Sequence, residues 1–265
     1  MIARCDGIEV GYDDVGAGLP VVFLHPFPLD RSYWSPQVAA VAARCRCIAP
    51  DMRGFGETAA APPYTMEQYA DDVACLLDAL DIERAVMVGL SMGGYIALAL
   101  WRRHPGRVRA LVLADTRAGA DSEQGRDRRR ALIDTARERG VGAVAEAQLP
   151  GLVGRTTRER RPDVGEALRR IIERSSVDGI AGALEAMMAR TDSTDLLATI
   201  DVPVLIVAGE EDVLTPPKEA RAMHTAIPGS RFELLSGAGH ASSFERPGAF
   251  THVLGEFLET VAGAQ

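Results

Sequence analysis

Short apolar runs alternate with amphipathic stretches along the first half of the chain. Apolar residues spaced by three or four positions predict helices over Tyr64–Asp81 and Met92–His104. Short continuous apolar runs predict buried strands, at Val21–Leu24, Cys45–Ala49, Ala85–Leu90 and Val108–Ala114. Because strands that alternate with helices pair in parallel and are buried on both faces, this pattern predicts an α/β fold built on a parallel sheet.

The same alternation returns in the last quarter of the chain. It predicts a strand at Val202–Ala208, a helix near Pro217–Ala226, a strand at Arg231–Leu235 and a final helix at Pro247–Val261. Residues 1–116 and 201–265 are therefore predicted to form one α/β core. Residues 117–200 are rich in Ala, Arg and Glu and show no convincing strand pattern. We expect this all-helical insertion to form a cap, or lid, over the ends of the strands.

Composition and charge limit the partners that the chain can have. The 265 residues carry a net charge of −8, which argues against nucleic acid or an anionic membrane surface as a partner. The basic run Arg126–Arg130 is interrupted by Asp127 and followed by Asp134 and Glu138, as is typical of a solvated helix face. The sequence shows no signal-peptide pattern, and no apolar run approaches the ~18 residues of a membrane span. We therefore expect a cytoplasmic protein, and the oligomeric state stays open.

The four cysteines are too few and too scattered to predict a disulfide framework. Cys45 and Cys47 alternate with Arg46 in a strand-like run, so we expect their thiols to share one face of the sheet as buried free thiols. A metal-binding pair is the weaker interpretation, because no second His or Cys pair lies nearby in the sequence.

One serine lies between a predicted strand and a predicted helix. The run Gly89-Leu90-Ser91-Met92-Gly93 fits G-x-S-x-G, with the strand ending at Leu90 and the helix beginning at Met92. Such a turn is sharp, and Gly89 and Gly93 remove side chains that would collide with the neighbouring chain. The turn presents Ser91 at a helix N-terminus, whose partial positive charge stabilises a developing anion. We interpret Ser91 as a nucleophile, with an ordinary helix N-cap as the alternative.

With this turn in its strand–helix context, the chain resembles the α/β-hydrolases of the esterase, lactonase and haloperoxidase-like group over essentially its whole length. The resemblance implies a mostly parallel eight-stranded sheet flanked by helices, with a helical lid inserted. It also implies a catalytic triad in the chain order serine, acid, histidine. The sequence carries no metal-ligand cluster and no dinucleotide or P-loop glycine motif, so no cofactor and no metal are expected.

A serine hydroxyl needs a base within reach and a third group that orients this base. Five histidines are available, and four of them precede the predicted turn or lie in or at the end of helices. The fifth, His240, comes at the end of the glycine-rich run Ser236-Gly237-Ala238-Gly239, which directly follows a predicted strand. This run matches the family's G-x-G-H. We therefore assign His240 as the general base.

The acid of the triad has four candidates. The resemblance selects Asp212, the third residue after Gly209 at the end of a predicted strand. Spacing alone leaves its neighbours Glu210 and Glu211 open. Some relatives place the acid one strand earlier, which here would be Asp115, although we expect Asp115 to be a loop residue beside the site.

Acyl transfer also needs hydrogen-bond donors for the tetrahedral oxygen. One is expected to be the backbone N–H of Met92. By the family's pattern the second lies in the stretch His25-Pro26-Phe27-Pro28, where Pro26 replaces the glycine of His-Gly-x-Pro. Proline has no N–H, but the expected donor is the N–H of Phe27, so the replacement removes no donor.

Two further features follow from the resemblance. The histidine of that stretch, His25, is expected to orient the oxyanion loop. The run from Asp51 to Gly56 matches the family's D-x-R-G-x-G, and we interpret it as a structural turn that braces the oxyanion region.

The parts predict a serine hydrolase that cleaves a small to medium carboxylic ester or lactone through an acyl-enzyme intermediate. The substrate-contacting residues are expected to be Phe27, Pro28, Leu149, Met187 and Met188. The elbow and the stretch Leu111–Thr116 also resemble enol-lactonases that open 3-oxoadipate lactones. An anionic substrate of that kind would need an arginine near the pocket, and none can be assigned from the sequence.

Two alternatives stay open. One is a cofactor-free perhydrolase of the haloperoxidase-like kind, for which Pro28 matches a proline beside the oxyanion loop. Peracid formation from hydrogen peroxide and a carboxylic acid, compared with ester and lactone hydrolysis, would separate it from an esterase. The other is a non-catalytic ligand-binding module on the same fold.

Overall fold

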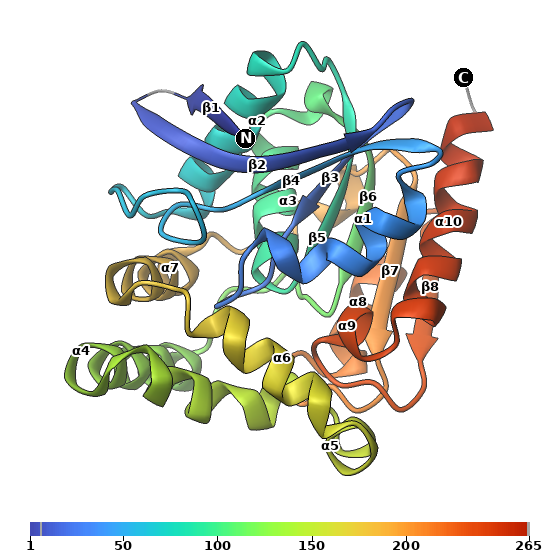
Figure 1. Cartoon of the computed structure of the whole chain (residues 1–265). Coiled ribbons are helices and arrows are strands. Elements are labelled where there is room, and N and C mark those ends of the chain that lie inside the picture. Colours follow the sequence, from blue (N-terminus) through green and yellow to red (C-terminus); the bar gives the residue numbers. More distant parts are fainter. Residues whose placement is uncertain (6, 264–265) are drawn as a thin grey trace.

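A computed structural model describes residues 1–5 and 7–263 as a sheet with helices on both faces (Figure 1). The eight strands lie in the order β1-β2-β4-β3-β5-β6-β7-β8. Their bounds are Ile2–Cys5 (β1), Ile8–Gly16 (β2), Leu19–Leu24 (β3), Cys45–Pro50 (β4), Ala85–Leu90 (β5), Val108–Ala114 (β6), Val204–Gly209 (β7) and Arg231–Leu235 (β8). The six strands from β3 to β8 pair in parallel, and β1 and β2 are antiparallel. The predicted mostly parallel eight-stranded sheet is confirmed.

Two layers of helices cover the sheet. The helices outside residues 117–200 are α1 (Ser35–Val41), α2 (Met66–Ala79), α3 (Met92–Arg103), α8 (Pro217–Ala226), α9 (Ser242–Glu245) and α10 (Pro247–Gly263). Two 3-10 turns, Arg31–Trp34 and Pro105–Arg107, lie in the same part of the chain, and a third, Leu197–Thr199, lies within residues 117–200. In Figure 1, α2 and α3 lie on one side of the sheet, and α1 and α10 lie on the other.

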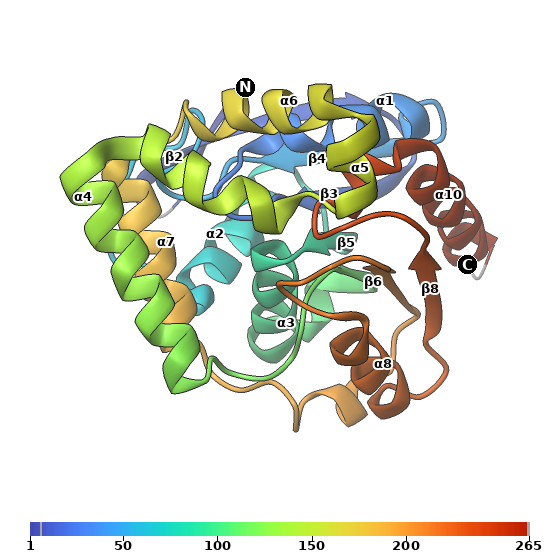
Figure 2. The same ribbon diagram turned by 90° about the horizontal axis from the view of Figure 1, so that it is seen from below.

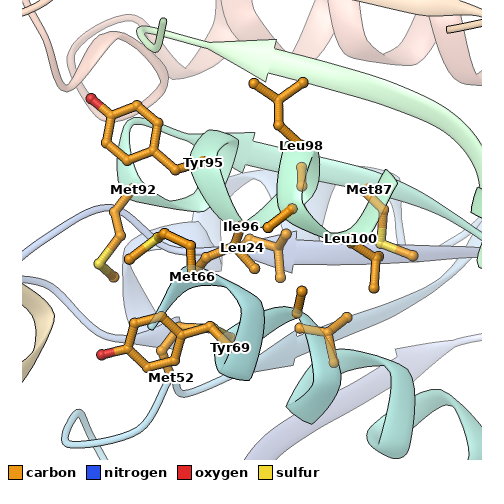
Figure 3. Packing of buried hydrophobic residues seen from close by; sticks show 14 of the residues in the cluster. Leu24, Met52, Met66, Tyr69, Met87, Met92, Tyr95, Ile96, Leu98 and Leu100 are labelled. Carbon is orange, nitrogen blue, oxygen red and sulfur yellow. The ribbon is translucent and has the colours of Figure 1, made fainter. Parts of the chain in front are cut away.

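Side chains of the central strands alternate between two hydrophobic clusters. In β3, Val22 and Leu24 belong to the cluster under α2 and α3, whereas Val21 and Phe23 belong to the one under α1 and α10. Figure 3 shows the first cluster, in which side chains of α2 and α3 pack around Leu24. Cys45 and Cys47 both point into the second cluster as free thiols, which confirms the prediction that they share one buried face. This two-sided burial is the reason that the strands read as continuous apolar runs.

The predicted helix at Tyr64–Asp81 is shorter in the structure, and both of its ends have local causes. Thr65 caps α2, because its side chain accepts a hydrogen bond from the N–H of Gln68 at 3.0 Å. At the other end Asp81 has a φ of 54°, which stops the helical hydrogen-bond ladder. The predicted strand at Val202–Ala208 likewise begins only after Pro203, which has no N–H for the ladder.

Four helices lie between β6 and β7. They are α4 (Glu123–Leu152), α5 (Arg155–Arg160), α6 (Pro162–Ile172) and α7 (Val177–Ala189), and no strand occurs among residues 117–200, all of which the structure describes. Gly140 breaks α4 with a φ of 78°, so α4 bends partway along its length (Figure 2). Figure 1 shows these helices gathered below the sheet. The division into a 1–116 and 201–265 core and a 117–200 cap stays a prediction.

A buried ion pair holds the loop after β4 against α2. Nη2 of Arg53 lies 2.7 Å from Oδ1 of Asp72, and both side chains are less than a tenth exposed. In the same loop, Asp51 accepts hydrogen bonds from the N–H groups of Arg31 and Glu57 at 2.8 Å each. Gly56 makes this possible, because a Cβ atom there would lie 2.0 Å from the Asp51 carboxylate. These contacts fit the structural role predicted for the D-x-R-G-x-G loop.

Replacing Arg53 by alanine should lower the free energy of unfolding by about 3–5 kcal/mol, because it leaves Asp72 buried without its counter-ion. Urea denaturation of the purified variant measures this loss. Arg44→Ala is the matched control: it breaks the exposed pair with Glu259 and should cost less than about 1 kcal/mol. Equal losses in the two variants would contradict the argument.

Candidate active site

Ser91 occupies a strained turn between β5 and α3. Its φ is 55° and its ψ −112°, values that a residue with a side chain rarely adopts. A Cβ atom on Gly89 would lie 2.3 Å from the carbonyl oxygen of Gly93, and one on Gly93 would lie 2.1 Å from that of Leu24. The two glycines are therefore required by backbone contact, as the sequence predicted. The Ser91 side chain makes no capping hydrogen bond to the helix, so the alternative of an ordinary N-cap does not hold.

His240 and Asp212 meet beside this turn. Asp212 lies three residues beyond β7, and its Oδ2 is 2.8 Å from Nδ1 of His240. The carboxylate also accepts hydrogen bonds from the Thr215 hydroxyl at 2.7 Å and from the N–H groups of Leu214 and Thr215 at 2.8 and 3.0 Å. Asp212 is thus fixed in position and fully supplied with donors.

The two neighbouring glutamates point away from His240. Glu210 accepts hydrogen bonds from Ser236 and Gly237, and Glu211 accepts hydrogen bonds from Thr156. Of these three adjacent acids, the structure therefore places only Asp212 against the imidazole.

Burial and mutual attraction oppose each other in this pair. Burial disfavours charge on both groups, but the two attract each other through the 2.8 Å contact. The attraction prevails, so the pKa of Asp212 lies below its usual value and the pKa of His240 lies above its usual value.

Asp115 is a loop residue beside the site, as expected from the sequence, but it is not at the surface. It follows β6 and is fully buried, where its carboxylate accepts hydrogen bonds from the N–H of Gly209 at 2.7 Å and from the Ser242 hydroxyl. Burial and the nearby charge of Asp212 raise the pKa of Asp115 well above its usual value. Asp115 follows a buried strand, so its carboxyl group lies in the interior beside the site. Sequence spacing alone could not show how fully this carboxyl group is buried.

The loop after β3 is held by His25. Nδ1 of His25 lies 3.1 Å from the carbonyl oxygen of Pro26, and Nε2 accepts a hydrogen bond from the N–H of Met52 at 3.0 Å. This assignment requires a neutral ring with its proton on Nδ1, which agrees with the lowering of the His25 pKa by burial. His25 thus links the expected oxyanion loop to the loop after β4.

Both expected oxyanion donors lie at the site. Phe27 lines the same pocket as Ser91, and Met92 directly follows the serine. In the described part of the chain, no protein acceptor takes the N–H of Phe27 or that of Met92.

A pocket of about 230 Å³ contains Ser91 and His240 in its lining. One part of its wall is apolar and comes from residues 117–200: Leu132, Leu152, Leu184 and Met187. The other part carries charge, from Arg117, Asp121, Arg128 and Arg129. The pocket therefore lies between the core and the helices of residues 117–200.

Only two of the five residues expected to contact substrate line this pocket. Phe27 and Met187 line it. Leu149 instead lines a separate cavity between α4 and α6, and neither Pro28 nor Met188 is among the described residues that line the pocket. Met188 lies about 100° around α7 from Met187 and packs against the core cluster, of which Met187 is also a member.

The arginines that line the pocket were not predicted from the sequence. Arg126–Arg130 is only partly a solvated face, because Arg128 and Arg129 line the pocket and the Arg129 side chain is only 19% exposed. Gly125, Arg129 and Leu132 lie three or four residues apart and so share one face of α4. The spacing of these three residues is visible in the sequence, but the sequence alone did not show that this face of α4 lies against the core.

Two kinds of feature are absent from the described residues. No group of three or more His, Cys, Asp or Glu side chains in that part of the chain is arranged to hold a metal ion. None of its helices has the length and apolar character needed to cross a membrane.

Comparisons with known proteins agree with this geometry. The model of the alpha/beta hydrolase fold family matches residues 20–247. A putative non-heme bromoperoxidase, BpoC, from Mycobacterium tuberculosis is 34% identical over 96% of this chain and 99% of that protein. A thermophilic esterase from Thermogutta terrifontis, solved with malate bound, is 39% identical with a TM-score of 0.94 over 98% of this chain and 97% of that one. The enol-lactonase from Burkholderia xenovorans is 34% identical with a TM-score of 0.91 over 98% and 100%. The chain belongs to the α/β-hydrolase family.

Proposed function

We propose that Ser91 is the nucleophile of a serine hydrolase that cleaves small to medium carboxylic esters or lactones through an acyl-enzyme intermediate. The protein is a hydrolase of the ester-cleaving class, in line with the esterase and the enol-lactonase to which it is similar. The observation that carries the assignment of residues is the shared pocket of Ser91 and His240, with Asp212 2.8 Å behind the imidazole.

The proposed reaction begins at the imidazole. With Nδ1–H of His240 donating to Asp212, Nε2 is unprotonated and acts as the base for the Ser91 hydroxyl. The serine oxygen attacks the carbonyl carbon, and the resulting oxyanion is bound by the N–H groups of Phe27 and Met92 at the N-terminus of α3. His240 then gives the proton to the departing alkoxide. Water, deprotonated by His240, releases the acid and restores the serine.

The pocket supports a substrate of modest size. Its volume of about 230 Å³ lies below the ~300–1,000 Å³ usual for pockets that bind drug-sized molecules. The apolar wall of Leu132, Leu152, Leu184 and Met187 suits the hydrocarbon part of an acyl group or of a lactone ring.

A perhydrolase is the second candidate, favoured by the similarity to a protein described as a bromoperoxidase. In that reaction, hydrogen peroxide would replace water as the attacking group on the acyl-enzyme, and the same three residues would serve. Pro28 is buried next to Phe27, which is compatible with both reactions. The non-catalytic alternative leaves the strained φ of Ser91 without a purpose, since such strain is kept mainly at functional sites.

Ser91→Ala should abolish ester hydrolysis and labelling by a fluorophosphonate probe, because the attacking oxygen is removed. Hydrolysis of p-nitrophenyl acetate and butyrate measures the first effect, and gel fluorescence measures the second. The melting temperature should not fall, because alanine removes only a hydroxyl that caps no helix. Retained activity in this variant would refute the assignment.

Asp212→Asn should reduce kcat/KM by about 10³–10⁴-fold, because the amide stabilises neither the required tautomer of His240 nor its charged form. The raised pKa of His240 means that activity is lost as the pH falls through that value. Removing the Asp212 charge lowers the pKa, so the acid limb of the residual activity should move to lower pH. The pH profile of kcat/KM between pH 5 and 9 measures both effects.

Asp115→Asn is the matched control for that variant. The Asp115 carboxyl group accepts hydrogen bonds from Gly209 and Ser242 rather than from His240, so the amide leaves the contact between Asp212 and the imidazole in place. Its effect on kcat/KM should stay within about tenfold. If Asp115→Asn were the more damaging change, the acid would belong to β6 instead of β7.

A further inference from the structure

Three arginines surround one buried carboxylate at the polar end of the pocket. Arg117 Nη2 lies 2.6 Å from Oδ1 of Asp121, Arg190 Nη1 lies 2.8 Å from the same oxygen, and Arg129 Nε donates to Oδ2. The Asp121 side chain is fully buried. One negative charge is therefore shared by three positive charges.

The excess of positive charge faces the cavity. Arg117 and Arg129 both line the pocket with Ser91, and so does Arg128 of α4, which forms no ion pair within the described residues. Asp121 is the only acidic side chain among the described residues of the lining. Although burial opposes its ionisation, the arginines lower the pKa of Asp121 to about 2. It therefore already carries its full negative charge, which leaves the cluster net positive.

Donors of these arginines are left without strong acceptors. Arg117 Nε is buried and has no hydrogen-bond partner within the described part of the protein. Arg129 Nη1 meets only the thioether sulfur of Met187, at 3.2 Å, which is a weak acceptor. Buried donors are usually satisfied, so unsatisfied donors beside an open cavity indicate a place for an anionic oxygen.

A purely structural role explains only part of this cluster. It explains Arg190, which is 3% exposed at its side chain, stacks over the Tyr95 ring at 4.2 Å and donates to two carbonyl oxygens. It does not extend to Arg128, which is exposed to solvent, lines the pocket and pairs with no acid in the described chain. Nor does it explain why Arg117 and Arg129 are turned to the pocket that contains Ser91.

We propose that Arg117, Arg128 and Arg129 bind a carboxylate carried by the substrate, remote from the carbonyl that Ser91 attacks. This inference rests on the proposed function of the same site. The substrate class is then a monoanionic ester or lactone, such as a half-ester of a dicarboxylic acid. Arginine suits this task, since its planar guanidinium donates two parallel hydrogen bonds to a carboxylate.

The distribution of charge along the chain also favours an anionic substrate. The protein has a net charge of −8, yet residues 117–200 contain 15 of its 29 basic residues and only 14 of its 37 acidic ones. The helices of residues 117–200, which form one side of the pocket, are therefore the least acidic part of the chain. Such a local field favours the approach of an anion to a protein that would otherwise repel it.

The test compares two esters of one diacid. We would measure kcat/KM for monomethyl and dimethyl succinate, glutarate and adipate, which differ in a single negative charge and in chain length. The wild-type protein should prefer the half-ester at one of these lengths. Arg128→Gln should reduce the ratio of half-ester to diester kcat/KM by about tenfold, mainly through a higher KM for the half-ester.

The control is a neighbouring arginine outside the pocket. Arg130 is exposed and pairs with Asp127 on the outer face of α4, so Arg130→Gln removes the same charge from the same helix. It should leave the ratio within about twofold of that of the wild type. A wild-type preference for the diester, or equal ratios in the two variants, would overturn the proposal.

A binding measurement separates this inference from the proposed function. Calorimetric titration of Ser91→Ala with monomethyl adipate needs no catalysis and should show binding that the additional Arg128→Gln change weakens about tenfold. If no ester were hydrolysed by the wild-type protein but this difference remained, the hydrolase assignment would fail and the carboxylate subsite would stand. Equal binding by the two proteins would refute the subsite.

Discussion

The packing of backbone against backbone at the carboxyl edge of the sheet is the constraint on which the site depends. The turn after β5 passes so close to β3 that a Cβ atom on Gly93 would lie 2.1 Å from the carbonyl oxygen of Leu24. In the same turn Ser91 has a positive φ, and its side chain makes no hydrogen bond to the helix that it precedes. The strain is of the order of 1–3 kcal/mol, and the surrounding sheet stabilises it.

A second close contact joins the loops of the acid and the base. A Cβ atom on Gly209 would lie 2.0 Å from the carbonyl oxygen of Gly239, and one on Gly239 would lie 2.3 Å from the nitrogen of Gly154. Glu245 spans this junction, since its carboxylate accepts hydrogen bonds from the N–H groups of Gly154 and Gly239 at 2.9 and 2.8 Å. The loop that carries His240 is therefore fixed to the junction of α4 and α5 as well as to the core.

Charge is divided between two regions around the pocket. Behind His240 lie the carboxyl groups of Asp212, Asp115 and Glu245, which raise the pKa of the imidazole against the effect of burial. Elsewhere in the pocket lining are Arg117, Arg128 and Arg129, of which Arg117 and Arg129 share Asp121 as a counter-ion. The first region suits a base that must accept a proton. The second suits the recognition of an anionic substrate group.

The sequence by itself determined the α/β class, the positions along the chain of the strands from β3 onward and the glycine-flanked turn around Ser91, and it singled out His240 among the five histidines. These features depend on local rules: two-sided burial gives continuous apolar runs, and a sharp strand–helix turn needs glycine on both sides of its serine. The antiparallel strand β2 was not predicted, because it lies near the edge of the sheet, where only part of its length is buried and Asp13 and Asp14 interrupt its apolar pattern.

Only the tertiary structure decided which acid meets His240, how deep Asp115 lies and which arginines face the pocket. Glu210, Glu211 and Asp212 are adjacent in sequence, and the hydrogen bonds of Ser236 and Thr156 hold the first two elsewhere. Arg128 and Arg130 are equally polar and belong to the same helix, yet only one of them lines the site. A helix presents every side chain by the same periodicity, and the choice of the inward face comes from what the helix packs against.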